Sequence, residues 1–349
     1  MRTLGYDAEI IYRQGKQQAI SDTLSRACLP LKPNEKPNAE FETVNMAQYL
    51  PVTEERLEQI RKATEQDEVL SCLKSVILRG WPEDNTQIIP KVVPYSSYRD
   101  ELTVQNGVIF RGERLVIPIS LRSEMKRSIH QSHLGIEGCL RLARDLIFWP
   151  GMSSEIRQFI SMCEVCQTYQ AKQNTRESLM SHDLPDRAWE KIGIDLFSLN
   201  TVEYLITVDY YSNFWEVDKL TSKKPPGIIK KLKAHFARYG CPDQVISDNE
   251  FVSHEFTEFA RTWGFDHIPC SPHHSNANGK VESAVKSAKR LLRKAQESKQ
   301  DPYLAILYHR NTPSQGIDRS PAQRLLGRRT KTLIPTSGSL LNQNDKETC

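Results

Sequence analysis

Three acidic residues stand in local sequences that could bring their carboxylates to one place. Asp195 lies in the run IGIDLF, Asp248 follows the run QVIS, and Glu282 lies one turn into the basic segment NGKVESAVKSAKRLL. The first two belong to β-type runs, and carboxylate oxygens are the ligands that Mg²⁺ and Mn²⁺ prefer. Taken alone, each acid could instead be a helix cap or a solvated side chain. Together they have the layout of a phosphoryl-transfer site, so we predict that all three are catalytic and bind a divalent metal.

Two pairs of potential zinc ligands precede these acids. His130 and His133 form a His-x2-His pair, and after twenty-nine intervening residues Cys163 and Cys166 form a Cys-x2-Cys pair. Zinc prefers four nitrogen or sulfur ligands in a tetrahedral arrangement, which two close pairs can provide. The alternative is that the histidines lie on a helix surface and the cysteines in a core. We favour a His2Cys2 zinc site because both pairs occur together, and we expect Cys139, which stands alone between them, to be a buried thiol.

The composition is that of a folded protein without a membrane-spanning segment. The sequence has 349 residues, of which 38% are hydrophobic and 26% charged, and its formal net charge is +4. No apolar run approaches the roughly 18 residues of a membrane span, and the N-terminus has no apolar stretch typical of a secretory signal. We therefore expect a soluble protein whose cysteines are thiols or metal ligands.

The segment that contains Glu282 is strongly basic. Of the twenty residues that follow Gly279, seven are basic and two are acidic. At helical spacing, Lys286 and Lys289 lie on the same face as Glu282, and Arg293 continues that face. Such a row can contact DNA phosphates in a salt-sensitive and largely sequence-independent way, although a solvated basic stripe would have the same pattern.

The pattern of apolar and turn residues divides the chain into helices and strands. A helical pattern over residues 54–80 is followed by short strands over 101–119, joined at Asn106-Gly107, and by three short helical pieces between 122 and 172. These pieces are too short to bury much core, so we expect a metal to stabilise them. Strands are then predicted at 189–197, 203–211, 214–220, 243–249 and 266–271, with helices at 228–240 and 253–264. This later part is therefore mixed α/β.

The motifs around these residues resemble those of a known family. The chain contains HQSHLGIEG, FWPGM, CEVCQ, GIDLF, YLITVDYYSNFWEV, SDN, NGKVESAVKSAKRLL and HRNTPSQGIDRSPAQRLLGRRTKTLIP. From about residue 60 to residue 341 the sequence resembles the integrase of gypsy-type LTR retrotransposons, within the retroviral integrase superfamily. The resemblance implies an α/β fold with a ribonuclease H-like mixed-sheet catalytic core, preceded by a small helical His2Cys2 zinc-binding domain.

The resemblance also implies a function. Such integrases are metal-dependent polynucleotidyl transferases that process the 3′ ends of element DNA and join them to target DNA. It implies a two-metal site with Mg²⁺ or Mn²⁺ at the three acids, and Zn²⁺ at the His2Cys2 residues. The residues that match DNA-binding positions are Lys280, Lys286, Lys289 and Arg293. We expect double-stranded DNA as the partner, both element ends and target, together with a homo-oligomer, no membrane association, and nuclear localisation after passage through the cytoplasm.

The same resemblance divides the chain into seven expected segments. They are a C-terminal remnant of a polyprotein ribonuclease H domain (1–28), a linker (29–55), a helical and small β N-terminal extension (56–120), a zinc-binding integrase domain (121–172), a second linker (173–188), the integrase catalytic core (189–300), and a post-core helical segment and tail (301–349). Asp22 falls on the last acidic position of the ribonuclease H domain. Because that domain's other acids would lie upstream, we expect no ribonuclease H activity.

One departure from the family pattern lies beside Asp248. The family usually has SDNGPQF, whereas this chain has SDNEFVSHEF, so thirty-three residues separate Asp248 from Glu282 instead of thirty-five. Positioning dominates phosphoryl transfer, and a displacement of about 1 Å is costly. Two functions therefore stay open: an active integrase, or a catalytically impaired relic or host-recruited protein that binds DNA without turnover.

Overall fold

The computed structural model describes residues 53–82, 84–169, 185–270, 279–314, 316–317 and 319–342. The chain divides into two compact units, Met1–Val44 and Asn45–Cys349, and every described residue belongs to the second. The predicted ribonuclease H remnant therefore lies outside the described residues, as does most of each predicted linker. In the part of the chain that the structure describes, no helix is both long enough and apolar enough to cross a membrane.

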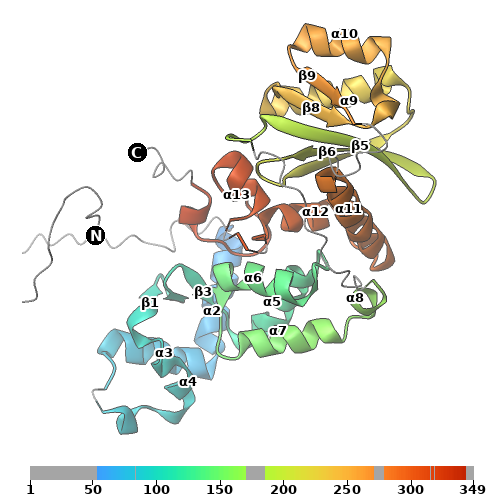
Figure 1. The fold of residues 1–349 in the computed structure, drawn as a ribbon. Helices are drawn as coiled ribbons and strands as arrows, with labels where there is room; N and C mark the ends of the chain where they lie inside the picture. The colour runs from blue at the N-terminus through green and yellow to red at the C-terminus, as the bar shows by residue number, and fades with distance from the viewer. Residues whose placement is uncertain are drawn as a thin grey trace, which may run out of the picture. The chain divides into compact units, whose positions relative to one another are not determined.

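The part that precedes the second linker consists of helices and a small sheet (Figure 1). Its helices are α2 (Glu54–Gln66), α3 (Glu68–Arg79), α4 (Val93–Ser96), α5 (Ile119–His130), α6 (Gly135–Leu146), α7 (Met152–Ser161) and α8 (Glu164–Thr168). Its strands are β1 (Leu102–Gln105), β2 (Val108–Arg111), β3 (Arg114–Val116) and β4 (Ile147–Phe148). The short 3-10 helices between α3 and β1 are η2 (Asn85–Gln87), η3 (Pro90–Val92) and η4 (Arg99–Glu101).

The helical pattern predicted over residues 54–80 forms two helices because Asp67 interrupts it. Oδ1 of Asp67 accepts hydrogen bonds from the backbone N–H groups of Val69 (3.0 Å) and Leu70 (3.1 Å), which caps the N-terminus of α3. Oδ2 accepts a further hydrogen bond from the N–H of Ile119 at 2.8 Å, at the start of α5. One carboxylate therefore fixes the boundary between two helices and the start of a third.

Strands β1 to β4 join the predicted extension to the predicted zinc-binding segment. Asn106 (φ +47°) and Gly107 (φ +80°) form the tight turn predicted between the antiparallel strands β1 and β2. Strand β4, from the zinc-binding segment, pairs in parallel with β3. One core is shared by this region and the post-core segment, and Phe110, Leu140 and Tyr308 are all fully buried in it. The short helices therefore do not depend on a metal alone, because the flanking segments supply part of their core.

The remaining elements follow the second linker. The strands are β5 (Lys191–Leu199), β6 (Val202–Asp209), β7 (Trp215–Leu220), β8 (Gln244–Ser247) and β9 (Asp266–Pro269). The helices are α9 (Pro225–Tyr239), α10 (His254–Trp263), α11 (Gly279–Glu297), α12 (Pro302–Asn311) and α13 (Pro321–Leu326), with the 3-10 helices η5 (Asn249–Phe251) and η7 (Gly338–Leu340). The predicted alternation of strands and helices is confirmed, and α9 begins three residues earlier than predicted, with prolines in its first turn.

The strands described after the second linker form one mixed sheet in the order β7-β6-β5-β8-β9. Strand β6 is antiparallel to both β5 and β7, whereas β8 is parallel to β5 and β9 is parallel to β8. The register between β5 and β8 pairs Ile192 with Val245 and Gly193 with Ile246. This order, with β6 alone reversed, confirms the ribonuclease H-like mixed-sheet core.

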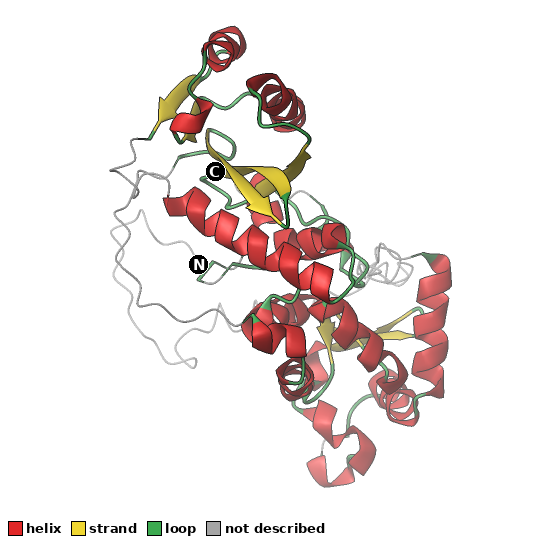
Figure 2. Cartoon of the chain, turned by 90° about the vertical axis from the view of Figure 1, so that its right-hand side faces the viewer, coloured by secondary structure: helices red, strands yellow, loops and turns green. Residues whose placement is uncertain are grey.

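Helices cover both faces of this sheet (Figures 1 and 2). On one face, Ile192 and Ile194 of β5 pack with residues of α9 and α10. On the other face, Phe197 of β5 packs with Val285 of α11. Because successive strand residues alternate between faces, Asp195 projects to the same side as Phe197. The first predicted acid and the helix that carries the third acid therefore share one face of the sheet.

The post-core segment has contacts on both sides of the second linker. Arg310 of α12 donates to Oε2 of Glu216 in β7 at 2.8 Å. Arg329, which is 3% exposed, donates to a carboxylate oxygen of Asp145 in α6. These two arginines belong to the HRNTP and RRT motifs of the sequence, and each has an ionic partner within the fold.

Candidate zinc and carboxylate sites

The predicted zinc ligands lie at the ends of two helices. His130 is the last residue of α5, and the N–H of His133 in the following turn donates to the His130 carbonyl at 2.8 Å. Cys163 is the N-cap of α8, and Cys166 lies in the first turn of that helix. One ligand atom from each of the four residues lies within 4.8 Å of the others. The structure thus brings together the two pairs that their spacing predicts.

The separations match those around a tetrahedral zinc ion. Nδ1 of His133 lies 3.5 Å from Sγ of Cys163 and 3.4 Å from Sγ of Cys166. Nε2 of His130 lies 3.6 Å from Sγ of Cys166. Tetrahedral zinc holds nitrogen and sulfur ligands about 3.5 Å apart, given its usual bond lengths. The set therefore fits Zn²⁺, bound by two imidazoles and two thiolates.

Burial sets the protonation of these ligands before a metal binds. It lowers the pKa of His130 and the pKa of His133 to about 4, so both imidazoles are neutral at physiological pH. It raises the pKa of Cys166 to about 11, so this sulfur keeps its proton until a cation displaces it. Zinc binding at the site is therefore coupled to proton release.

Two further side chains contact the ligands, and their spacing in the sequence gives no sign of it. Cys139 is a fully buried thiol, as predicted, and its Sγ lies 3.8 Å from Nδ1 of His130. Nζ of Lys294 in α11 donates to the His133 carbonyl at 2.9 Å and lies 3.9 Å from Sγ of Cys166. The helical repeat places Lys294 on the same face of α11 as Ser287 and Arg290, so the sequence gives no sign that its side chain is buried.

The three predicted acids lie on neighbouring elements. Asp195 is in β5, Asp248 directly follows β8, and Glu282 is in the first turn of α11. Strands β5 and β8 are adjacent, and α11 packs on β5. Gly193 permits this close packing, because a Cβ atom there would overlap Cγ2 of Val281. A glycine two residues before the first acid therefore lets the first turn of α11 approach the strand.

Burial and like charges both disfavour ionisation of the two aspartates. Burial raises the pKa of Asp195 to about 6, against a hydrogen bond from the N–H of Leu196, and the charges of Asp248, Glu250 and Glu282 add to the rise. The pKa of Asp248 is also raised, by burial and by the charge of Glu250. The three predicted acids thus share one electrostatic environment, which a divalent cation would stabilise.

These acids do not form a closed ligand set. Within the described ranges, the His2Cys2 residues are the group whose ligand atoms all lie within 4.8 Å, and the three carboxylates form no such group. Residues 271–278, which precede α11, lie outside the described residues. The oxygen donors of Asp195, Asp248 and Glu282 suit Mg²⁺ or Mn²⁺ in charge and chemical type.

Glu250 is a fourth acid at this site, and the spacing of the triad does not predict it. Its N–H donates to Oδ1 of Asp248 at 3.1 Å, so that Asp248 caps the short helix η5. Its charge raises the pKa of Asp195 as well as that of Asp248. The signal for Glu250 in the sequence is its place in SDNEFVSHEF, where the family usually has glycine. The altered loop therefore adds negative charge to the site in addition to shortening it.

The four basic residues predicted to bind DNA have two kinds of environment. Lys286 and Arg293 are exposed on α11, and Lys289 is partly exposed. Lys280 turns toward the sheet, where its Nζ donates to the Tyr210 carbonyl, and burial lowers the pKa of Lys280 to about 8. Three of the four side chains therefore present their charge to solvent, whereas the charge of Lys280 is directed inward.

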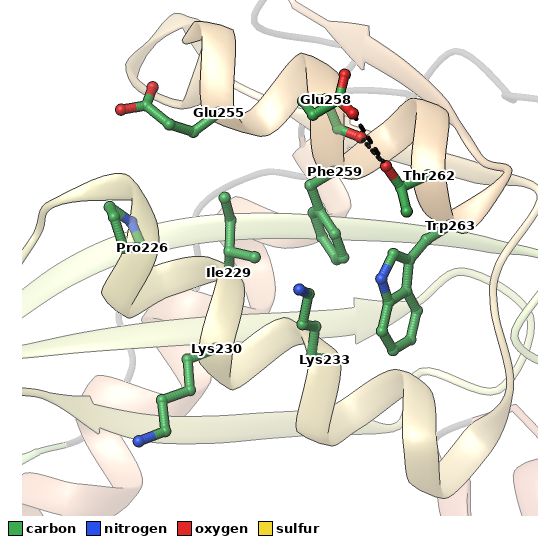
Figure 3. A pocket seen from close by; sticks show the side chains of 9 residues that line it. All are labelled: Pro226, Ile229, Lys230, Lys233, Glu255, Glu258, Phe259, Thr262 and Trp263. Carbon is green, nitrogen blue, oxygen red and sulfur yellow. Dashed lines mark hydrogen bonds between the residues drawn. The ribbon is translucent and has the colours of Figure 1, made fainter.

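A separate cavity of about 460 Å³ lies between α9 and α10 (Figure 3). Ile229 of α9 and the rings of Phe259 and Trp263 of α10 line it, and Nζ of Lys233 lies 5.7 Å from the centre of each ring. None of the predicted acids lines this cavity. It lies on the face of the sheet opposite α11 and is therefore distinct from the carboxylate site.

Comparison with known proteins covers the zinc-binding segment and most of the chain. Residues 117–172 match the family model of the integrase zinc binding domain. The chain is 30% identical over 300 residues, 82% of its length, to an uncharacterized protein of Caenorhabditis elegans. It is 26% identical over 223 residues, 61% of its length, to the retrovirus-related Pol polyprotein from transposon opus of Drosophila melanogaster. This chain resembles a retroviral-type integrase.

The chain spans 23% of the first relative and 21% of the second. Among solved structures, it is similar to a chain of the simian T-cell lymphotropic virus intasome in complex with the PP2A regulatory subunit B56 gamma. That similarity has 16% identity and a TM-score of 0.44, and it covers 60% of this chain and 75% of the other. The match of the zinc-binding segment also supports Zn²⁺ as the ion for the four clustered ligands.

Proposed function

We propose that this chain is the integrase region of a gypsy-type LTR retrotransposon polyprotein and that it is a metal-dependent polynucleotidyl transferase. Its substrates are double-stranded DNA: the ends of the element and the target. It carries out 3′-end processing and strand transfer as a homo-oligomer in the nucleus. The proposal includes a ribonuclease H tail over residues 1–28.

One observation carries the proposal: Asp195 in β5, Asp248 at the end of the adjacent strand and Glu282 on the helix packed on β5 lie together, and burial, followed by the charges of the neighbouring acids, raises the pKa of Asp195. A partly buried carboxylate next to two others is costly unless a cation or hydrogen-bond donors compensate. Groups perturbed in this way are concentrated at functional sites. A structural role for all three acids would not require them to share one environment, whereas binding of a divalent cation would.

Each residue of the site has a task in this proposal. Asp195 and Asp248 present oxygens from two hydrogen-bonded strands, and Glu282 presents its oxygens from the helix that packs on Gly193. Mg²⁺ or Mn²⁺, when bound, supplies charge neutralisation and Lewis acidity for in-line displacement at phosphorus. Exposed Lys286 on the same helix holds DNA phosphates near these acids.

The two reactions differ in the attacking group. In 3′-end processing, the oxygen of water forms the new P–O bond, and the 3′-hydroxyl of the element strand leaves. In strand transfer, that 3′-hydroxyl forms the new P–O bond, and a 3′-hydroxyl of the target strand leaves. Both reactions exchange one P–O bond for another, so no oxidant or reductant is needed.

A strand-transfer assay with the full chain tests the proposal. The substrates are a double-stranded oligonucleotide with recessed 3′ ends and a plasmid target, with Mg²⁺ or Mn²⁺ supplied. We expect joined products from the wild-type chain and none from Glu282→Gln. Glu255→Gln, at an exposed position of α10 on the opposite face of the sheet, is the matched control and should join DNA normally. Joining that persists in Glu282→Gln or without a divalent cation would contradict the proposal.

The second candidate is a DNA-binding protein without turnover, and the contact between Glu250 and Asp248 favours it. An extra negative charge beside the second acid, in a loop two residues short, can displace the site enough to stop the chemistry. Replacing Glu250 by Gly-Pro-Gln restores the usual length of the loop. Joining by the restored chain alone, with equal DNA binding by both, would identify the native chain as a relic.

A further inference from the structure

Lys294 links the helix of the third acid to the zinc ligands. It lies twelve residues after Glu282 in α11, about 18 Å along the helix axis. Its side chain is 5% exposed, although lysine is almost never fully buried without a partner. Its Nζ donates to the His133 carbonyl at 2.9 Å and lies 3.9 Å from Sγ of Cys166. A core helix of the sheet thus places a cation against two of the four zinc ligands.

The strength of the contact between Lys294 and Cys166 depends on whether the sulfur is a neutral thiol or a zinc-bound thiolate. Burying an ammonium group is costly unless anionic or strongly polar acceptors compensate. A carbonyl and a neutral thiol are weak compensation, whereas a zinc-bound thiolate carries negative charge toward Nζ. Side chains that hydrogen-bond to the ligands of a metal also hold those ligands in place. Lys294 is therefore best satisfied when the His2Cys2 site holds zinc.

A second contact joins α11 to the segment of α8 that contains Cys166. The hydroxyl of Tyr169, one residue beyond α8, donates to Oε1 of Glu297 in the last turn of α11. Residues of α8 and α11 are also close along their backbones. The helix that contains Cys166 is therefore fastened to α11 at Lys294 and again at Glu297.

We propose that Lys294 is a positioning residue that couples zinc binding at His130, His133, Cys163 and Cys166 to the docking of α11. Zinc strengthens the contact between Lys294 and Cys166, and docked α11 strengthens zinc binding by the same factor, because such coupling is reciprocal. The order of the helix that carries Glu282 thus depends on zinc bound at a separate site. This inference rests on the zinc site and holds whether or not the chain joins DNA.

The first test measures zinc affinity of the full chain by competition with a chromogenic chelator. Lys294→Met keeps most of the length and apolar stem of the side chain but removes the charge and the donor. We expect zinc to bind about 10- to 100-fold more weakly, the usual cost of removing a partner of a metal ligand. Arg293→Met, at the adjacent exposed position, is the matched control and should bind zinc as the wild type does. Lys294→Arg keeps a donor and should recover part of the affinity.

The second test follows amide hydrogen exchange, with and without zinc, in the wild-type chain and in Lys294→Met. Zinc should slow exchange in the last turns of α11, around residues 290–297, and leave exchange in α10 unchanged. In Lys294→Met the zinc-dependent protection of α11 should be lost. Equal zinc affinity for Lys294→Met and wild type would overturn the inference, as would exchange in α11 that does not respond to zinc. Neither readout depends on strand transfer, so the inference and the proposed function can fail separately.

Discussion

The zinc site and the carboxylate site differ in how far the folded chain assembles them without a metal. At the zinc site, nitrogen and sulfur atoms approach to 3.4 Å and 3.6 Å. At the carboxylate site, the described residues bring no three acids within the 4.8 Å that the zinc ligands satisfy. Neutral imidazoles and thiols can converge before the metal binds, whereas neighbouring carboxylates repel one another when ionised. The fold therefore completes the first site and leaves the second dependent on a cation.

The two sites also differ in where their ligands come from. The zinc ligands lie at the ends of α5 and α8, two helices that contribute to one core. The acids come from β5, from the residue after β8, and from α11, which is packed on the sheet. Small errors in helix packing therefore affect the carboxylate site more than the zinc site. Charge repulsion between the acids and the packing of α11 on the sheet can each determine how well the carboxylate site assembles, and separate variants test them.

The largest effect is expected from loss of a zinc ligand. Cys166→Ser should weaken zinc binding by more than the 10- to 100-fold typical of an outer partner, because a thiolate bond to the metal is lost. Metal analysis of the purified chain and chelator competition measure the change. Cys139→Ser is the control, since its sulfur contacts His130 but is not among the clustered ligands. Full zinc occupancy with unchanged affinity in Cys166→Ser would rule out the His2Cys2 assignment.

A substitution at Gly193 tests whether the close packing of α11 on β5 positions the third acid. A Cβ atom at this position would overlap Val281 and lie 2.9 Å from Cε2 of Tyr210. Gly193→Ala should therefore push α11 from β5 and lower the free energy of unfolding by about 1–3 kcal/mol, the usual cost of overpacking. Denaturant unfolding followed by tryptophan fluorescence measures the loss.

The control for Gly193→Ala is the double variant with Val281→Ala, which removes the atoms that the new Cβ would meet. It should recover part of the stability lost in the single variant. A single variant as stable as the wild type would show that close packing of α11 on β5 does not position the third acid.

The pH dependence of divalent cation binding tests whether ionisation of the clustered acids controls the carboxylate site. Burial and the neighbouring acids raise the pKa of Asp195 to about 6. A cation binds the ionised form, so protons compete as the pH falls through 6, and one unit below that pKa the affinity for Mn²⁺ should be about 10-fold lower. Electron paramagnetic resonance, which distinguishes free from bound Mn²⁺, measures the binding. Asp195→Asn should bind Mn²⁺ weakly at every pH, and a wild-type affinity that stays constant from pH 7 to pH 5 would contradict the assignment.

Local spacing predicts much of the fold and of the zinc site. Two residues separate His130 from His133, and two separate Cys163 from Cys166. One helix end can therefore present both members of a pair. The turn at Asn106 and the alternation of strands and helices along the chain after residue 189 follow from turn chemistry and apolar periodicity. The split of the first helical pattern at Asp67 is not predicted, although Asp is a common N-cap residue and its capping bonds to Val69 and Leu70 are local in the sequence.

The features of the two sites that the sequence does not predict depend on contacts between residues distant in the sequence. The charge of Glu250 matters because β8 runs beside β5, which puts it near Asp195. Lys294 and Lys280 have the same chemistry in sequence as their exposed neighbours on α11. Their buried environments come from the His133 carbonyl and from the β6–β7 turn, which only the folded chain supplies. Residue type and spacing therefore predict ligand sets better than they predict which basic side chains face solvent.

The difference between exposed and buried basic side chains on α11 predicts the smallest effect, which concerns DNA binding. Each phosphate contact contributes about 0.9 to the slope of log affinity against log salt concentration for duplex DNA. Lys286→Ala should therefore lower the slope by about that amount, because Lys286 is exposed beside Glu282. Lys280→Ala should leave the slope unchanged, because its Nζ donates to the Tyr210 carbonyl. Fluorescence anisotropy with a labelled duplex across a salt series measures both. Equal losses of slope in the two variants would mean that Lys280 leaves the carbonyl when DNA binds, and that the carboxylate site is rearranged by its substrate as well as by a cation.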